Sequence, residues 1–248
     1  MRRLSLGCML LCVGAPVLAD DSPPTFDRPG ISFPTATLPR GGLAWEQGLP
    51  DGSWDKTHGV RSTTWVADTL LRYGLSETVE VQLGVDSFGG VHLRGDGASG
   101  TQSGDGWVSV KWVPASSIDS FSWGVLATAS LPFGEAPLGD GGNNYDIGVA
   151  ASWDLPHDAS VSLYLDGAWG DGGSGWLFSP SYSFQLSDDV GAFVEAGFGT
   201  GAQEQRVAGG GITWMATKRV QLDTWFLRGL DHNSLDWQAG VGMSIYFD

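Results

Sequence analysis

The sequence is poor in cysteine, in basic residues and in long apolar runs. Its two cysteines, Cys8 and Cys12, both lie in the first 19 residues, so disulfides and thiol chemistry are excluded for the rest of the chain. Only 13 Lys and Arg stand against 28 Asp and Glu, giving a net charge of −15. A nucleic-acid surface needs clustered basic residues, so we expect no nucleic-acid partner. After residue 19 no segment approaches the about 20 apolar residues of a membrane-spanning helix.

The first 19 residues have the pattern of a secretory signal. Arg2 and Arg3 form a basic start, residues 4–13 are mostly apolar, and Val17, Leu18 and Ala19 resemble a small-residue cleavage site. We therefore expect a signal peptide over residues 1–19 and a mature chain that begins at Asp20.

From Gly41 onward the hydrophobic pattern has a period of two and no convincing helical period. In residues 79–86, for example, every odd position is aliphatic and every even one is polar or Gly, which puts the two sets on opposite faces of a strand. The pattern predicts about twelve strands, over residues 41–48, 61–73, 77–87, 106–113, 120–131, 144–155, 159–169, 175–186, 190–199, 206–215, 219–229 and 235–247.

The predicted connections fall into two alternating classes. Short turns are expected at residues 74–76, 114–119, 156–158, 187–189 and 216–218. The other connections are mostly longer and rich in Gly and Asp, notably 49–59, 88–105 and 132–143. Short turns at one end and long loops at the other are typical of an outer-membrane barrel.

A soluble β-sandwich also alternates, but other features favour a membrane barrel. The predicted strands run 8 to 13 residues, close to the about 9 to 11 of a tilted membrane-spanning strand. Aromatic residues gather near the strand ends, as interfacial girdles require: Trp45, Tyr73, Trp107, Trp112, Tyr145, Trp153, Trp169, Trp176, Trp237 and Phe247. We therefore expect an all-β, closed antiparallel transmembrane barrel over residues 41–248, with residues 20–40 as a periplasmic lead-in. Its expected partners are outer-membrane lipid, lipopolysaccharide and the barrel-assembly machinery.

Several segments resemble a known family. They are Asp27-Arg28-Pro29-Gly30, Gly42-Leu43-Ala44-Trp45-Glu46, LLRYGLSETVEVQLG at 70–84, Leu131-Pro132-Phe133-Gly134, GGGITWMATKRVQLDTWFLRGL at 209–230 and a closing Ile245-Tyr246-Phe247. On these the chain resembles the bacterial outer-membrane transporters grouped as the MetA pathway of phenol degradation family. The resemblance implies a closed barrel and a transport role without a defined substrate. Such barrels usually end on the aromatic residue, whereas this chain ends on Asp248.

If the apolar face meets lipid, the other face carries charge into the lumen. The inward set then contains nine acids and two bases: Glu46, Asp68, Arg72, Glu80, Asp86, Lys111, Asp146, Asp154, Asp166, Glu195 and Asp223, together with Gln82. One interpretation is that these charges pair and fill a narrow lumen. However, two cations cannot neutralise nine carboxylates, and an unpaired buried carboxylate is costly. The alternative is a hydrated, electronegative channel that favours cations.

Seven of these residues are the candidate lumen and selectivity residues: Glu46, Asp68, Arg72, Glu80, Lys111, Glu195 and Asp223. All but Glu195 lie on strands that become neighbours when the last strand closes against the first. Arg72 and Glu80 flank the 74–76 turn at nearly equal distance, so we expect them to pair across the hairpin in a structural role.

Catalytic and metal sites have weaker support. None of the four histidines (His58, His92, His157 and His232) is placed for a His-Ser lipase, and no pair has metal-ligand spacing. Asp231 and His232 could imitate a surface protease, but exposed loop residues explain them more simply. Residues 139–146 carry oxygen ligands for Ca²⁺ without the twelve-residue pattern of a calcium loop, so Ca²⁺ binding by the outer loops stays open. We expect no enzyme and no cofactor.

The sequence thus predicts a passive channel for small molecules, with aromatic compounds suggested by the family name. The alternative is a structural or surface-recognition barrel whose lumen is plugged. Substrate, pore radius and oligomeric state do not follow from the sequence, because they depend on barrel shear and loop folding.

Overall fold

The computed structural model describes residues 24–57, 60–94, 99–139 and 141–248. The signal peptide predicted at 1–19 lies outside these residues and stays a prediction. The strands are β1 (Leu43–Thr57), β2 (Val60–Gly74), β3 (Val79–Arg94), β4 (Gly100–Gln102), β5 (Gly106–Trp112), β6 (Phe121–Leu131), β7 (Asn144–Leu155), β8 (Ala159–Gly170), β9 (Gly173–Ser187), β10 (Val190–Gly201), β11 (Arg206–Thr217), β12 (Val220–Gly229) and β13 (Trp237–Phe247).

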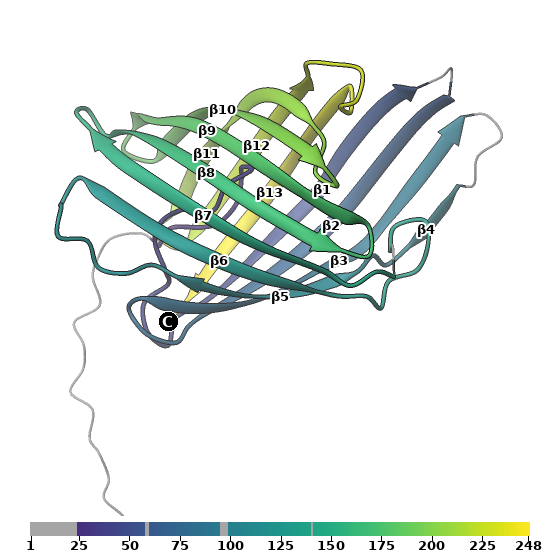
Figure 1. The fold of residues 1–248 in the computed structure, drawn as a ribbon. Coiled ribbons are helices and arrows are strands. Elements are labelled where there is room, and N and C mark those ends of the chain that lie inside the picture. The colour runs from purple at the N-terminus through teal and green to yellow at the C-terminus, as the bar shows by residue number, and fades with distance from the viewer. Residues whose placement is uncertain (1–23, 58–59, 95–98, 140) are drawn as a thin grey trace, which may run out of the picture.

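Twelve of these strands close into one antiparallel barrel (Figure 1). Each pairs with its neighbour along the chain, except that β4 adds only a short pairing to the far end of β3, and β5 continues the wall beside β3. The ring closes where β1 pairs with β13, and β2 pairs with both β1 and β3. The predicted closed barrel is confirmed. Among the described residues, no helix is long and apolar enough to cross a membrane.

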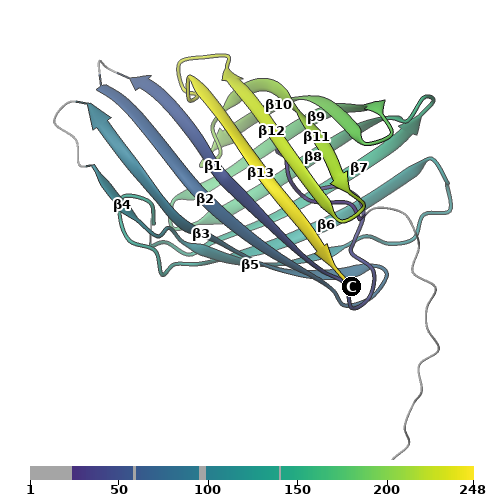
Figure 2. The same cartoon turned by 180° about the vertical axis from the view of Figure 1, so that it is seen from behind.

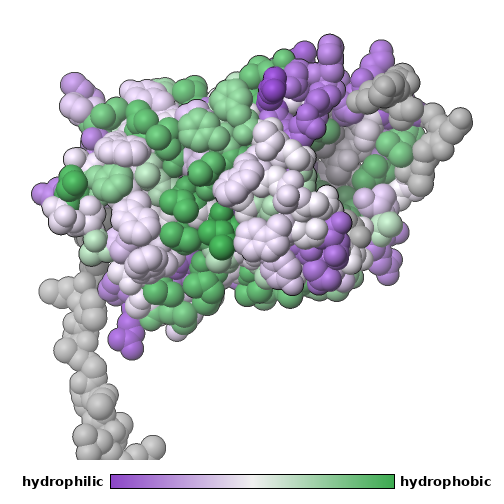
Figure 3. All heavy atoms as spheres, in the orientation of Figure 1, coloured by the Kyte–Doolittle hydropathy of each residue, from purple (hydrophilic) through white to green (hydrophobic). Residues whose placement is uncertain are grey.

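The predicted alternation also sets which face points outward. Leu83, Val149 and Val241 expose 51%, 41% and 46% of their surface, whereas their neighbours Gln82, Ala150 and Gly242 are buried. In Figure 3 the middle of the visible face is covered mainly by hydrophobic and weakly polar side chains, and strongly hydrophilic ones gather towards its ends. A barrel with an apolar outer band is suited to lipid rather than to water.

Strands extend into two of the three long loops expected from the sequence. β1 continues to Thr57 through the expected loop 49–59, and β3 continues to Arg94 through part of the expected loop 88–105. In β1 the cause is a bulge between Gly48 and Asp51, where β1 advances by three residues while its partner β13 advances by two. The extra residue shifts the alternation by one position, so the residues before and after the bulge do not follow a single period of two. The second half of β1 therefore lacks the sequence pattern of a continuous strand. The third expected loop, 132–143, contains no strand in its described part.

The short turns lie together at one end of the barrel, which we call the turn end. They connect β2 to β3, β5 to β6, β7 to β8, β9 to β10 and β11 to β12, as predicted. The C-terminus lies at this end as well (Figures 1 and 2). We call the opposite end, with the other connections, the loop end.

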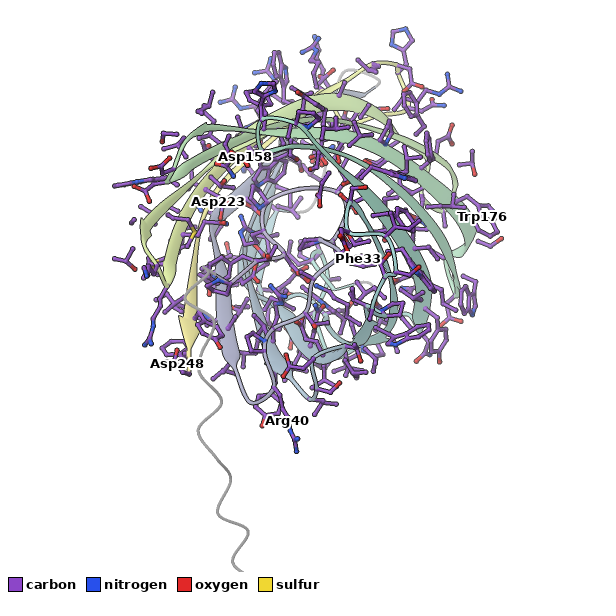
Figure 4. The ribbon with its side chains drawn as sticks, turned by 90° about the vertical axis from the view of Figure 1, so that its left-hand side faces the viewer. Phe33, Arg40, Asp158, Trp176, Asp223 and Asp248 are labelled. Atoms are coloured by element: carbon purple, nitrogen blue, oxygen red, sulfur yellow. The ribbon has the colours of Figure 1, made fainter. Side chains whose placement is uncertain are left out.

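The described part of the expected lead-in, residues 24–40, folds into the barrel. Its backbone and side chains contact inward-facing residues of β1, β2, β3, β5, β8, β10 and β12. Figure 4 shows Phe33 of this N-terminal segment inside the ring of strands, while Trp176 points away from it. This position differs from the expected periplasmic lead-in ahead of the barrel, and the charges of the segment, described below, explain the difference.

Candidate functional site in the barrel lumen

All seven predicted lumen residues contact the N-terminal segment. Glu46 accepts hydrogen bonds from the backbone N–H groups of Asp27 and Arg28, Glu80 from Leu38 and Glu195 from Ile31. The other four make contacts with its side chains or carbonyls: Asp68 and Asp223 with Arg28, Lys111 with Asp27, and Arg72 with Asp27 and the Thr25 carbonyl. The sequence therefore identified the wall of a binding site whose occupant is part of the same chain.

Arg72 forms the centre of a buried ion cluster at the turn end. Its guanidinium lies 2.7 Å from Glu46 Oε1 and 2.7 Å from Glu80 Oε1, which confirms the predicted pairing across the β2–β3 hairpin. Asp27 joins the cluster at 3.1 Å from Arg72 and accepts a hydrogen bond from Lys111. The side chains of Arg72, Glu46, Glu80 and Lys111 are fully buried, so their charges are balanced within the protein rather than by water.

Arg28 lies in a second cluster, formed by the carboxylates of three strands. Its guanidinium donates two hydrogen bonds to Asp51 (2.9 and 3.0 Å) and contacts Asp68 (3.1 Å) and Asp223 (3.5 Å). Burial alone would lower the pKa of Arg28, but the hydrogen bond to Asp51 and the negative charges of Asp68, Asp51 and Asp223 raise that pKa above its usual value. Arg28 is therefore a permanent cation that offsets part of the excess negative charge of the wall.

Glycines of β1 and β13 make room for the Arg28 side chain. Gly48 and Gly242 are paired across the two strands, and a Cβ at either position would collide with the Arg28 guanidinium or with the Asp68 carboxylate beside it. The wall thus combines small residues with carboxylates at one place. Such a socket fits a planar guanidinium lying close to the backbone.

The other side of the N-terminal segment packs against β7, β8 and β9. Phe33 contacts Tyr164 edge-on, with ring centroids 5.8 Å apart, and belongs to a buried cluster with Ala150 and Leu177. Leu126 of β6 packs against the same cluster. Salt bridges hold one side of the segment and apolar contacts the other.

The described residues line at least two cavities in the lumen. The first, of about 450 Å³, lies towards the turn end between the N-terminal segment and a hydroxyl-rich wall: Ser152, Ser160, Ser162, Ser181, Ser183 and Thr213. The second, of about 520 Å³, lies towards the loop end and is lined by Gln82, Asp86, Asp105, Trp107, Ser109, Leu126, Thr128, Ser130, Leu138, Asn144 and Asp146. We call them the inner and the outer cavity. Cavities of this size accommodate small molecules.

Sequence reasoning missed Asp27 and Arg28 as lumen residues. It noted them only as part of the Asp-Arg-Pro-Gly element ahead of the first strand. The excess of nine inward acids over two inward bases was a usable signal, because a further cation in the lumen would lower the cost of burying these carboxylates. Arg28 is that cation, and the inward-facing glycines of β1 and β13 mark where it docks.

The described residues contain no group of three or more His, Cys, Asp or Glu arranged to hold a metal ion. Residues 139–146, considered for Ca²⁺, include Asp140, which lies outside the described residues, and Asp146, which lines the outer cavity. His157 occupies a tight turn with φ 66°, and His58 is outside the described residues.

The sequence model of a family described as "Putative MetA-pathway of phenol degradation" matches residues 26–247. The chain belongs to this family. The match begins inside the N-terminal segment, two residues before Arg28. The family model therefore covers most of this segment as well as the barrel. No curated protein matches the chain.

Solved structures similar to this family member include an outer-membrane channel, a porin and an autotransporter translocator domain. The COG4313 outer membrane channel from Pseudomonas putida F1 has 16% identity and a TM-score of 0.66, with 86% of this chain and 98% of that chain covered. The KdgM porin in complex with disordered oligogalacturonate has 12% identity and a TM-score of 0.59, covering 84% and 99%. The translocator domain of the autotransporter NalP from Neisseria meningitidis has 16% identity and a TM-score of 0.53, covering 85% and 90%. At these identities the likeness establishes the fold.

Proposed function

We propose that the protein is a passive channel that lets small molecules diffuse across the outer membrane. The observation that carries this proposal is the presence of an inner and an outer cavity, of about 450 and 520 Å³, at the two ends of one lumen. Polar side chains line much of both cavities, which suits water and dissolved solutes rather than lipid. A passive channel needs no cofactor and no catalytic step, and we assign the protein neither.

The acidic lining gives this channel a preference against anions. Asp86, Asp105 and Asp146 line the outer cavity, and Asp188, Asp189 and Glu195 line the inner one. Among the described lining residues the one base is Arg28, which its three carboxylate neighbours already balance. A lumen with excess negative charge between low-dielectric walls attracts cations and repels anions.

We propose that the seven predicted lumen residues act on permeation mainly by fixing the N-terminal segment. Four of them, Glu46, Arg72, Glu80 and Lys111, are completely buried and bonded to one another or to the segment, so a passing solute does not meet them. Asp68 and Asp223 hold Arg28 in the same way. Glu195 also lines the inner cavity, and it is the one of the seven that we expect a solute to approach.

The family description names phenol degradation, which makes aromatic compounds the first solutes to test. The proposed route to the membrane is secretion directed by residues 1–19, followed by insertion with the barrel-assembly machinery. The proposed surroundings are outer-membrane lipid and lipopolysaccharide, with the loop end outside and the turn end in the periplasm.

A second function is a plugged, structural barrel, which the position of residues 24–40 in the lumen favours. Single-channel recording in a planar bilayer separates the two functions. A passive channel gives discrete openings whose reversal potential under a salt gradient shows cation preference. A folded, inserted barrel without openings and without solute flux supports the plugged barrel.

A further inference from the structure

The inward residues of β6, β7 and β8 change character along the barrel axis. On β7, Asp146 lines the outer cavity, Ala150 is buried in an apolar cluster, and Ser152 lines the inner cavity. Neighbouring strands follow the same order. Counted from the loop end, β6 carries Thr128, Leu126 and Ser122, and β8 carries Asp166, Tyr164 and Ser162. On β6, β7 and β8 the lumen wall is therefore polar at both ends and apolar at one level between them. The facing wall is charged, and the Lys111 ammonium lies 5.4 Å from the centre of the Phe33 ring.

Phe33 of the N-terminal segment completes this level from inside the lumen. Its side chain is only 7% exposed and belongs to one cluster with Ala150, Tyr164 and Leu177, against which Ile31 and Leu126 pack. We call these six residues the apolar layer. Its position between the cavities follows from their linings, because Phe33 borders the inner cavity and Leu126 borders the outer one.

The segment is held so that Phe33 stays at this level. On one side of Phe33 along the chain, the Ile31 backbone N–H donates to Glu195 Oε2 at 2.9 Å. On the other side, the Thr35 and Ser122 hydroxyls lie 2.6 Å apart, and the Leu38 N–H donates to Glu80. Contacts to three different strands, β10, β6 and β3, therefore fix the segment on both sides of Phe33 along the chain.

We propose that Phe33 is the specificity-determining residue of the channel, at an apolar constriction between two polar cavities. A hydrated ion or a sugar loses hydrogen bonds with water at this level without gaining partners, because an apolar constriction dewets. A solute with an apolar face packs against the Phe33 ring and keeps its polar groups towards the hydroxyl-rich wall. The favoured class is thus small uncharged molecules that combine an aromatic or aliphatic face with hydrogen-bonding groups.

This inference rests on the proposed channel function, and its test separates the two. Purified protein in liposomes is given two uncharged solutes of similar size that cross lipid slowly: phenyl glucoside, which has an apolar ring, and a disaccharide of two pentoses, which has none. Wild type is compared with Phe33→Ser and with Phe33→Leu, which keeps the apolar side chain. Phe133→Ser, the same substitution at an exposed residue outside both cavity linings, is the matched control. Leu126→Ser tests the same layer from the barrel wall, should Phe33→Ser not fold.

We expect wild type, Phe33→Leu and Phe133→Ser to pass phenyl glucoside several-fold faster than the disaccharide. Phe33→Ser and Leu126→Ser should lower this ratio several-fold and raise the single-channel conductance for KCl. An unchanged ratio and conductance in both folded serine variants would overturn the role of Phe33 while leaving the channel intact. Wild-type protein that passes neither solute would overturn the channel function, and this inference with it.

Discussion

The guanidinium of Arg28 occupies the space that a side chain at Gly242 of β13 would need. Gly242 pairs with Gly48 on one side and with Asp223 on the other, so the same three-strand region supplies both the room and part of the negative charge for Arg28. Sequence segments more than two hundred residues apart thus meet at the seam where the barrel closes. Docking of the N-terminal segment is therefore linked to closure of the barrel.

Gly242→Ala should weaken this docking, because its new methyl group meets the guanidinium. Overpacking of a tight site typically costs about 1 to 3 kcal/mol, so we expect the urea midpoint of unfolding in detergent micelles to fall. Gly172→Ala is the control, because a Cβ at Gly172 meets nothing within 4 Å. Equal midpoints for the two variants would show that Arg28 does not need the space above Gly242.

Arg72→Met should be the most destabilising single change in the lumen. It leaves Glu46 and Glu80 buried without the guanidinium that neutralises them, and breaking a buried ion pair in this way costs about 3 to 5 kcal/mol. Adding Glu46→Gln and Glu80→Gln should recover much of the loss, because the uncompensated charges disappear. Urea unfolding of the single and triple variants measures both effects.

Arg219→Met provides the control for the loss of an arginine. Arg219 pairs with Asp248 at the turn end, and both side chains are more than half exposed. Exposed ion pairs contribute little to stability. If Arg72→Met were as mild as Arg219→Met, the buried cluster would not hold the structure together as described.

The alternation of the sequence was enough to predict the barrel, the outward residues and the charged wall. Leu83 and Gln82, for instance, were placed correctly on opposite faces because the phase of β3 is clear near its turn. Alternation failed at Leu49 and Pro50, where a bulge reverses the phase and conceals the second half of β1. A local pattern contains no information about such a shift in register, which pairing with β13 reveals.

The candidate site was predicted in part, for a different physical reason. Arg72 and Glu80 flank one turn, so their pairing follows from local geometry. Arg28 contacts Asp223, which lies far away in the sequence, so the period of two does not predict this contact. The segment around Arg28 has no strand pattern. The imbalance of charge on the wall was compatible with a further cation, but it did not indicate which residue supplied it.

Val149→Arg should interfere with membrane insertion, since Val149 lies near the middle of β7 on the outer face. An arginine facing lipid near the bilayer midplane costs about 2 to 4 kcal/mol. Asp146→Arg, on the same strand but bordering the outer cavity, should insert normally. The fraction of each variant that shows the heat-modifiable gel shift of a folded barrel is the measurement. Similar fractions would mean that the two faces of β7 are wrongly assigned.

Single cysteines test the orientation, because the chain from residue 20 onward contains none. Ser99 lies exposed at the loop end and Ser117 lies exposed at the turn end. On intact cells an impermeant thiol reagent should label Ser99→Cys and leave Ser117→Cys unlabelled. Labelling of Ser117→Cys alone would reverse the orientation.

The central claim is that solutes diffuse through the lumen, past the N-terminal segment, and blocking the inner cavity tests it most directly. Ser162→Cys places a thiol in that cavity, and Trp176→Cys places one on the outer face, where Trp176 is 61% exposed. Each variant is reconstituted in liposomes, treated with a bulky maleimide, and assayed for phenyl glucoside uptake before and after treatment. We predict that modification of Ser162→Cys abolishes uptake and that modification of Trp176→Cys leaves it unchanged. Undiminished uptake through fully modified Ser162→Cys would contradict the claim.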